Sequence, residues 1–231
     1  MQMSLFDGKE GCFKHPAKYS DVLLPYIYEE IKNSKKLLDP FAGTGKIAKI
    51  KNWGYNGEIY ANDIEKDWLS PNVYGCDYIS FQDAEYLEYP KNYFDAIATS
   101  PTYGNRMADH FNSKENSRRI TYTHYLGKEL QDGNTGKMHF GAEYKEKHKR
   151  IYKHLYELCN KSGKIVVNIS NFIKNGEEVD VVGWTTQTLK NVGFVYIKTI
   201  WVKTPRMKFG KNSEKRVEKE AILVFEKICE V

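Results

Sequence analysis

Short runs of apolar residues alternate with helical patterns along most of this chain, and this alternation constrains its fold more than any other feature. The run Phe94 to Thr99 has the composition of a strand buried on both faces, and an apolar helical stripe over 143–160 comes later. Strands that alternate with helices form parallel sheets, because each helix carries the chain back to the start of the next strand. Further strands are expected at 36–39, 57–61, 73–79, 164–169, 194–202 and 221–227. Further helices are expected at 20–31, in a separate segment that ends near Gly54, and at 179–191.

The last two strands follow each other without a helix between them, so we expect an antiparallel edge on a mostly parallel α/β sheet. Ser20 and Asp21 are expected to cap the first helix, with Pro25 in its first turns. No repeat, low-complexity tract or linker divides the sequence, so residues 1–231 are predicted to form a single domain.

Residues 104–140 break the alternating pattern. They contain four glycines and several Asn and Ser residues, and their apolar residues follow no sustained period. Compact domains rarely contain such long irregular segments without a function for them. We therefore expect this insert to be either a target-recognition segment or a solvated lid over a bound ligand.

The composition excludes several classes of protein. A hydrophobic content of 41% supports a packed core, and no apolar run approaches the roughly 18 residues that cross a bilayer. The first ten residues lack the pattern of an export signal. The four cysteines lie far apart without a C-x-x-C pair, so a disulfide framework and a zinc knuckle are both disfavoured. We expect a cytoplasmic protein of a prokaryotic or phage-infected cell, without a membrane association and without a metal.

A glycine-rich turn follows the first strand. Gly43 and Gly45 allow the backbone to approach a ligand closely, where a Cβ would collide. Lys46 is followed by Ile47 instead of Ser or Thr, so a phosphate-binding P-loop is disfavoured. Asp63 lies beyond the second strand, near the spacing of an acid that binds ribose hydroxyls.

A second turn, Ser100-Pro101-Thr102-Tyr103, directly follows the buried strand at 94–99. With D-P-F-x-G-x-G at 39–45 before it, the chain resembles the S-adenosylmethionine-dependent amino-methyltransferases that act on adenine N6 or cytosine N4 of DNA and carry a D/N/S-P-P-Y motif. With the cofactor motif before the catalytic one, it resembles phage-type or orphan DNA methylases, and the resemblance covers most of the chain. It implies a Rossmann-like, seven-stranded methyltransferase fold. Thr102 departs from the pattern, which has a second Pro there, so the turn is expected to be less rigid.

The resemblance assigns roles to individual residues. Ser100, Pro101 and Tyr103 match the catalytic turn. The cofactor-binding residues that it implies are His15, Pro16, Lys18, Asp39, Phe41, Gly43, Gly45, Asp63, Asp83 and Ala84.

An exocyclic amine is a poor nucleophile, because its lone pair is delocalised into the base. Two acceptors on its hydrogens, Ser100 Oγ and the Pro101 carbonyl, would direct that lone pair at the methyl group. Tyr103 offers a face on which the base can stack. A base inside a duplex cannot reach such a turn, so the target is expected to be flipped out or single-stranded.

The formal charge of +5 is unevenly distributed. The insert carries six Lys or Arg against four acids, interleaved with aromatic residues, and the segment 203–219 carries seven against two. Basic and aromatic residues together are typical of phosphate contact and base stacking. The candidate DNA contacts are Arg106, Arg118, Arg119, Tyr122, Arg206, Lys208 and Lys211.

Two alternatives remain open. One is an RNA methyltransferase of the guanine-N2 type, which shares similar turns, including a Gly after the Tyr. The other is a nucleic-acid-binding module that keeps the fold without catalysis, for which Thr102 is the only support.

Neutralising Arg206, Lys208 and Lys211 together is expected to weaken DNA binding and to flatten its salt dependence, because fewer counterions are released. A binding titration over a range of salt concentrations measures this slope. An unchanged slope would contradict the assignment.

Overall fold

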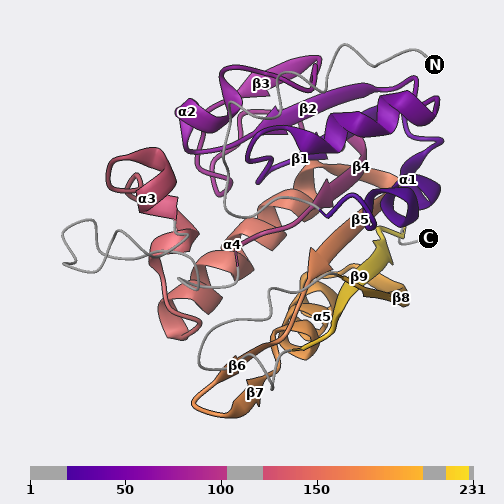
Figure 1. Ribbon diagram of the computed structural model, residues 1–231. Coiled ribbons are helices and arrows are strands. Elements are labelled where there is room, and N and C mark those ends of the chain that lie inside the picture. Colours follow the sequence, from indigo (N-terminus) through magenta and orange to yellow (C-terminus); the bar gives the residue numbers. More distant parts are fainter. Residues whose placement is uncertain (1–19, 103–121, 205–216, 229–231) are drawn as a thin grey trace.

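The computed structural model describes residues 20–102, 122–204 and 217–228. Its main strands are β1 (Lys36–Asp39), β2 (Glu58–Asn62), β3 (Tyr78–Ser80), β4 (Phe94–Thr99), β5 (Cys159–Ile169), β8 (Val195–Lys203) and β9 (Lys219–Glu226). They form one sheet in the order β3-β2-β1-β4-β5-β9-β8 (Figure 1). The first five pair in parallel, and β9 runs antiparallel to both of its neighbours. The expected α/β sheet with an antiparallel edge is confirmed.

Helical segments and a small hairpin complete the described structure. They are α1 (Leu24–Ile31), η1 (Lys46–Trp53), α2 (Lys66–Leu69), α3 (Tyr122–Leu126), η3 (Thr135–Lys137), α4 (Ala142–Leu158) and α5 (Val181–Val192), with the hairpin strands β6 (Phe172–Lys174) and β7 (Glu177–Val179).

Neighbouring residues of the central strands point to opposite faces of the sheet, as the period of a strand requires. Leu37 lies in a core cluster with α1 and η1, whereas Leu38 lies in a second cluster with α4 and α5. Val166 and Val167 of β5 divide in the same way. Both faces are therefore covered, which explains why these strands are continuous apolar runs in the sequence.

The observed bounds correct several expected ones. Strands 36–39 and 94–99 agree with the prediction. The segment before Gly54 is a 3-10 helix, in which the buried Ile47 and Ile50 recur at the three-residue period of that helix. Ser20 and Asp21 do not cap α1: its N-cap is Leu23, without a side-chain hydrogen bond, because Pro25 sets the first turn later in the chain.

The sequence prediction missed the β6–β7 hairpin and the early start of β5. Helix α4 leads directly into β5, whose first residue, Cys159, pairs with Phe94. The hairpin turns at Asn175 and Gly176, which both have positive φ, at 52° and 85°. Asn-Gly is the strongest short hairpin signal, so this element was visible in the sequence. Figure 1 shows the hairpin extending away from the main sheet below α5.

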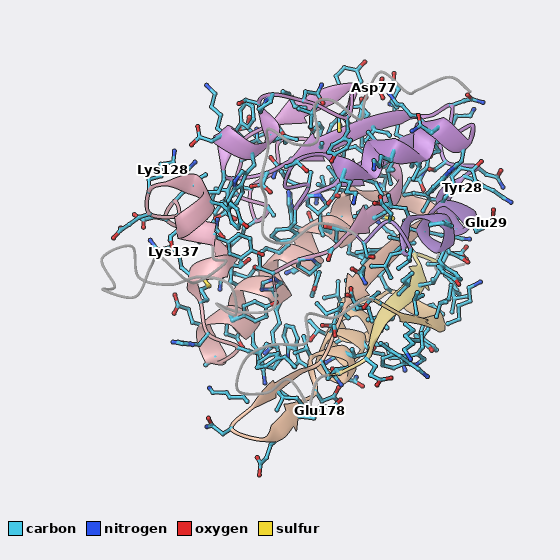
Figure 2. The ribbon with its side chains drawn as sticks, viewed as in Figure 1. Tyr28, Glu29, Asp77, Lys128, Lys137 and Glu178 are labelled. Carbon is cyan, nitrogen blue, oxygen red and sulfur yellow. The ribbon has the colours of Figure 1, made fainter. Side chains whose placement is uncertain are left out.

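Part of the expected irregular insert is ordered around α3 and η3. Figure 2 shows Lys128 and Lys137 on this side of the molecule. Each lies against an acid: Lys128 Nζ is 2.5 Å from Asp67, and Lys137 Nζ is 2.9 Å from Asp132. Within the described ranges, no helix is long and apolar enough to span a bilayer.

Gly45 has little room for a side chain in the site-forming turn. Its φ is +78°, and an added Cβ would lie 2.8 Å from Cys76 Sγ. Gly75 has a similar φ of +74° with nothing within 4 Å of such a Cβ. A substitution at Gly75 therefore measures backbone strain alone, whereas one at Gly45 measures strain together with a collision.

Gly75→Ala is expected to lower the free energy of unfolding by about 1 kcal/mol, from left-handed strain alone. Gly45→Ala is expected to lower it by about 2–3 kcal/mol, because the collision adds to the strain. Chemical denaturation measures both values, and Gly45→Ala with Cys76→Ala tests the added part. Equal losses in the two single variants would contradict this account.

Candidate functional site

The carboxyl ends of the five parallel strands lie along one side of the sheet. β1 lies between β2 and β4: Leu38 pairs with Tyr60 on one side and with Ile97 on the other. The strand order reverses between β1 and β4, and ligands of open α/β sheets bind at such a reversal. The glycine-rich turn, 39–45, and the described start of the second turn, 100–102, leave the sheet at this point.

Asp39 connects these two turns. Its side chain is fully buried, and Oδ1 accepts hydrogen bonds from Phe41 N at 3.1 Å and from Thr99 Oγ1 at 2.8 Å. Because Thr99 precedes Ser100, this contact holds the end of β4 against the glycine-rich turn.

Asp63 holds the glycine-rich turn from the β2 side. Gly43 has a φ of 55°, and its N–H donates to Asp63 Oδ2 at 2.7 Å. Asp63 Oδ1 accepts from Glu65 N at 2.9 Å. Burial, opposed by these two hydrogen bonds, raises the pKa of Asp63 to about 7. Asp63 is thus adjacent to the turn, as the sequence spacing indicated.

Asp83 and Ala84 lie on the same edge, after β3. Asp83 Oδ2 accepts from Lys147 Nζ of α4 at 2.6 Å, and Oδ1 accepts from Glu85 N at 3.1 Å. Ala84 is buried. Gly133 of the insert packs here, since a Cβ on it would lie 2.6 Å from Asp83 Oδ2.

The turn after β4 is held by three separate elements. Ser100 Oγ donates to Asn168 Oδ1 of β5 at 3.1 Å. The Thr102 hydroxyl is 2.7 Å from that of Thr135, and the Tyr144 hydroxyl donates to the Thr102 carbonyl. The hydroxyl contact with Thr135 is one that a Pro would lack, and it compensates for the rigidity expected to be lost there.

The described part of the insert also docks on the end of β2. Glu65, which is fully buried, accepts at Oε1 from Gln131 N at 2.7 Å and from Asn134 Nδ2 at 2.8 Å. Together with the Thr102–Thr135 contact, this places residues 131–136 between the end of β2 and the turn after β4. The insert is thus part of the wall of the site.

Tyr122 is the one expected DNA contact that the structure describes, and its position differs from the expectation. Its side chain is 4% exposed and packs against Trp68, with ring centroids 5.6 Å apart. Leu130 completes this small cluster. A buried aromatic in such a cluster supports α3 against α2 and offers no free face to a base, so the nucleic-acid role expected for Tyr122 is corrected.

The remaining expected site residues lie outside the described ranges. They are His15, Pro16, Lys18, Tyr103, Arg106, Arg118, Arg119, Arg206, Lys208 and Lys211.

The sequence prediction missed several residues that the structure brings to this edge: Glu65, Thr135, Tyr144, Lys147, Asn168 and Glu220. Asn168 had a visible signal, because it is a polar residue at the end of an otherwise apolar strand. Glu65, Thr135, Tyr144 and Lys147 sit on irregular or helical segments and Glu220 on strand β9, and their contacts depend on the tertiary structure.

The acidic side chains at this end of the strands restrict which cofactor fits. Four carboxylates, from Asp39, Asp63, Glu65 and Asp83, gather at the ends of β1, β2 and β3. Of these side chains, Asp63 and Asp83 are partly exposed, and their oxygens would accept hydrogen bonds from hydroxyl and amino groups. A ligand with a ribose, amines and a positive charge, such as S-adenosylmethionine, fits this set. Among the described residues, no group of three or more His, Cys, Asp or Glu side chains is arranged to hold a metal ion.

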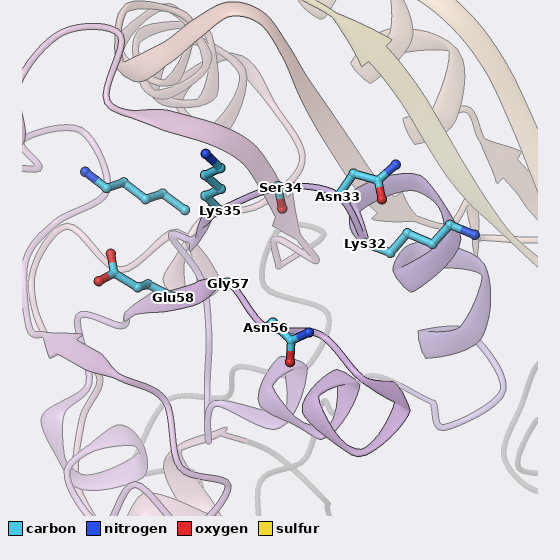
Figure 3. Close-up of a pocket in the computed structure, with 8 residues that line it drawn as sticks. Lys32, Asn33, Ser34, Lys35, Asn56, Gly57 and Glu58 are labelled. Carbon is cyan, nitrogen blue, oxygen red and sulfur yellow. The ribbon is translucent and has the colours of Figure 1, made fainter.

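A polar pocket lies at the other end of the strands (Figure 3). It is lined by Lys32, Lys35, Asn56 and Glu58, at the start of β1 and β2. Since the pairing of Lys36 with Glu58 marks the amino ends of these strands, this pocket is separated from the turns by the length of the sheet.

No protein-family model matches this sequence, and no curated protein matches it. Solved structures do resemble it. The [4+2]-cyclase SpnF has a TM-score of 0.58 at 14% identity, covering 91% of this chain and 82% of its own. An S-adenosylmethionine-dependent methyltransferase from Methanosarcina mazei also has a TM-score of 0.58, at 10% identity, covering 89% and 98%.

A third structure is the 1,6-didemethyltoxoflavin-N1-methyltransferase of Burkholderia thailandensis, which was solved with bound S-adenosylhomocysteine. Its TM-score is 0.55 at 10% identity, over 90% of this chain and 78% of its own. The chain therefore has the Rossmann-like fold of S-adenosylmethionine-dependent methyltransferases. Because a cyclase shares the fold, the reaction must be inferred from the site.

Asp63→Asn is expected to remove a loss of stability that the wild type undergoes as the pH rises. A carboxyl whose pKa is higher in the folded than in the unfolded state costs stability as the pH rises from the unfolded value of 3.8 through 7. The amide removes this cost, which is about 1–2 kcal/mol at pH 8 once it is reduced from full linkage for partial exposure. Its NH2 group faces one of the two backbone N–H donors, Gly43 N or Glu65 N, and this mismatch lowers the free energy of unfolding by the same amount at every pH.

Chemical denaturation at pH 8 and at pH 4 measures the free energy of unfolding of the variant and of the wild type. The variant should compare more favourably with the wild type at pH 8 than at pH 4. Asp132→Asn, the same exchange at a fully exposed side chain, is the matched control. A difference between Asp63→Asn and the wild type that is equal at the two pH values would contradict the assigned cause.

Proposed function

We propose that this chain is a methyltransferase that moves a methyl group from S-adenosylmethionine to the exocyclic amine of adenine (N6) or cytosine (N4) in DNA. The observation that carries the proposal is the hydrogen bond between Thr99 Oγ1 and Asp39 Oδ1. It joins a glycine-rich turn suited to the cofactor to a Ser-Pro turn suited to an amine, at the point where the strand order reverses.

The residues proposed to hold the cofactor follow the edge of the sheet. Asp63 would accept hydrogen bonds from the ribose hydroxyls, and Asp83 from the adenine amine, while the backbone at Gly43 and Gly45 allows close approach. When bound, S-adenosylmethionine supplies an electrophilic methyl group on a sulfonium. Since Gly43 N already donates to Asp63, that carboxylate is oriented before the ligand arrives.

The target amine is proposed to lie against Ser100 and Pro101. Ser100 Oγ and the Pro101 carbonyl would accept its two hydrogens and so hold the nitrogen lone pair towards the methyl group. Tyr103 would stack on the base, which has to leave its duplex to reach the turn. This arrangement uses positioning and hydrogen bonding, so the described residues need supply no nucleophile of their own.

The free thiols of the described residues do not suggest covalent catalysis. Cys76 and Cys159 are both buried, and burial raises the pKa of each thiol to about 12. Neither thiol would be ionised near neutral pH, which removes the thiolate that a cysteine nucleophile requires.

Incubation with methyl-labelled S-adenosylmethionine and separate pools of unmodified DNA and RNA tests the proposal. We expect label in DNA, recovered as N6-methyladenine or N4-methylcytosine. Label in RNA alone would reject DNA as the substrate and favour a guanine-N2 activity. Cofactor and DNA binding without transfer of label would favour a non-catalytic module.

Ser100→Ala is expected to lower kcat by about 10–100-fold while the Kd for the cofactor changes less than about twofold, because it removes an acceptor used in the transition state. Tyr103→Ala should likewise lower kcat and leave the Kd for the cofactor nearly unchanged. Calorimetry and turnover measurements separate the two effects. An equal loss of cofactor binding and of turnover would contradict the roles assigned to both residues.

A further inference from the structure

A chain of hydrogen bonds runs from the Ser-Pro turn into the antiparallel part of the sheet. Thr99 pairs with Val167, so the residues that follow them, Ser100 and Asn168, lie side by side at the carboxyl ends of β4 and β5. Ser100 Oγ is 3.1 Å from Asn168 Oδ1, and Asn168 Nδ2 is 3.1 Å from Glu220 Oε2 of β9. Thr204 Oγ1 donates to the other oxygen of Glu220, Oε1, at 3.1 Å.

The direction of this chain is determined by its acceptors. Asn168 Nδ2 faces the Glu220 carboxylate and, at 3.4 Å, the Ala221 carbonyl, and both can only accept hydrogen bonds. The amide nitrogen must therefore point to β9, and the amide oxygen must point to Ser100. Because Asn168 is only 2% exposed, water cannot readily substitute for these partners.

It follows that the Ser100 hydroxyl donates its one hydrogen to Asn168. A serine hydroxyl has one hydrogen and two lone pairs, and it usually rotates to suit its surroundings. Here the hydrogen is engaged inside the protein, so the lone pairs are left for an incoming group. Ser100 Oγ is thereby an acceptor towards whatever occupies the site.

We propose that Asn168, oriented by Glu220, is a positioning residue that makes Ser100 an obligate hydrogen-bond acceptor and so selects bases with an exocyclic amine over bases with a carbonyl at that position. This inference rests on the proposed function and adds a specificity mechanism to it. Adenine N6 and cytosine N4 carry hydrogens that such an acceptor binds. A keto oxygen would face lone pairs without a hydrogen between them, a mismatch that excludes it.

Glu220→Gln tests the direction of the chain without removing any side chain. A Gln amide nitrogen can donate to Asn168 Oδ1, which lets the Asn168 amide turn over and donate to Ser100. Ser100 would then be free to donate into the site. We expect kcat for methyl transfer to fall about 10-fold or more, with KM for S-adenosylmethionine changed less than about twofold.

Two further variants separate positioning from a structural role. Ser100→Ala combined with Glu220→Gln should be no slower than Ser100→Ala alone, because Glu220 acts through Ser100. Glu226→Gln, the same exchange at the opposite end of β9, is the matched control and should leave kcat unchanged. Independent, multiplying losses in the double variant would overturn the proposal.

A binding measurement gives a readout that does not depend on turnover. With S-adenosylhomocysteine present, the wild-type protein should bind an oligodeoxyadenosine about 10-fold more tightly than an oligomer of equal length built from purine 2′-deoxyriboside. This nucleoside differs from deoxyadenosine only in lacking the amine. The analogous pair for cytosine uses an oligomer of its 4-desamino analogue. Glu220→Gln and Ser100→Ala should abolish the preference in whichever pair shows it.

These measurements distinguish a failure of the proposed function from a failure of the inference about Asn168. If the wild type keeps the amine preference but transfers no label to any nucleic acid, the proposed function fails while the selection by Ser100 stands. If the wild type transfers label but has no amine preference, or if Glu220→Gln keeps the wild-type preference and kcat, the inference about Asn168 fails and the proposed function stands.

Discussion

Strand β1 is only four residues long, yet it pairs in parallel on both sides, and its last residue, Asp39, is a fully buried carboxylate. A buried charge is costly unless hydrogen bonds stabilise it, and Phe41 N and Thr99 Oγ1 supply them from two different segments. This carboxylate therefore requires the glycine-rich turn and the end of β4 to lie together. A slip of one residue in β1 would exchange its two buried faces and move Asp39 away from both partners.

The elements that the sequence predicted well are those in which a local pattern and the tertiary environment agree. Residues 94–99 are apolar on both faces because helices cover both sides of β4, and their bounds followed directly from that run. The start of α1 was misplaced because Ser20 and Asp21 have the composition of a cap, whereas Pro25 and local turn geometry decide the start. The sequence prediction lacks the β6–β7 hairpin although Asn175-Gly176 signals it, because a pattern of alternating strands and helices has no place for an extra hairpin.

The candidate site was predictable only in part. Asp39, Asp63, Asp83 and Ser100 follow strands, and parallel strands bring such positions to one edge. Glu65 and Asn168 matter through partners that lie 52 to 69 residues away, and no local pattern identifies those partners. Charge was a weaker guide: Lys128 and Lys137 lie against acids, and Tyr122 is buried, so the described part of the insert is built more as a wall than as a phosphate-binding surface.

Strand β9 is late in the sequence but lies inside the sheet, between β5 and β8. Until it inserts, β5 is an open edge, Asn168 lacks its partner Glu220, and the Ser100 hydroxyl is free to rotate. During synthesis, the ribosome must therefore release residues up to about 226 before Glu220 and Asn168 can orient the Ser100 hydroxyl. Both sequence turns emerge more than a hundred residues earlier. A nascent chain would pass through a state in which both turns have emerged and Asn168 does not yet orient the Ser100 hydroxyl.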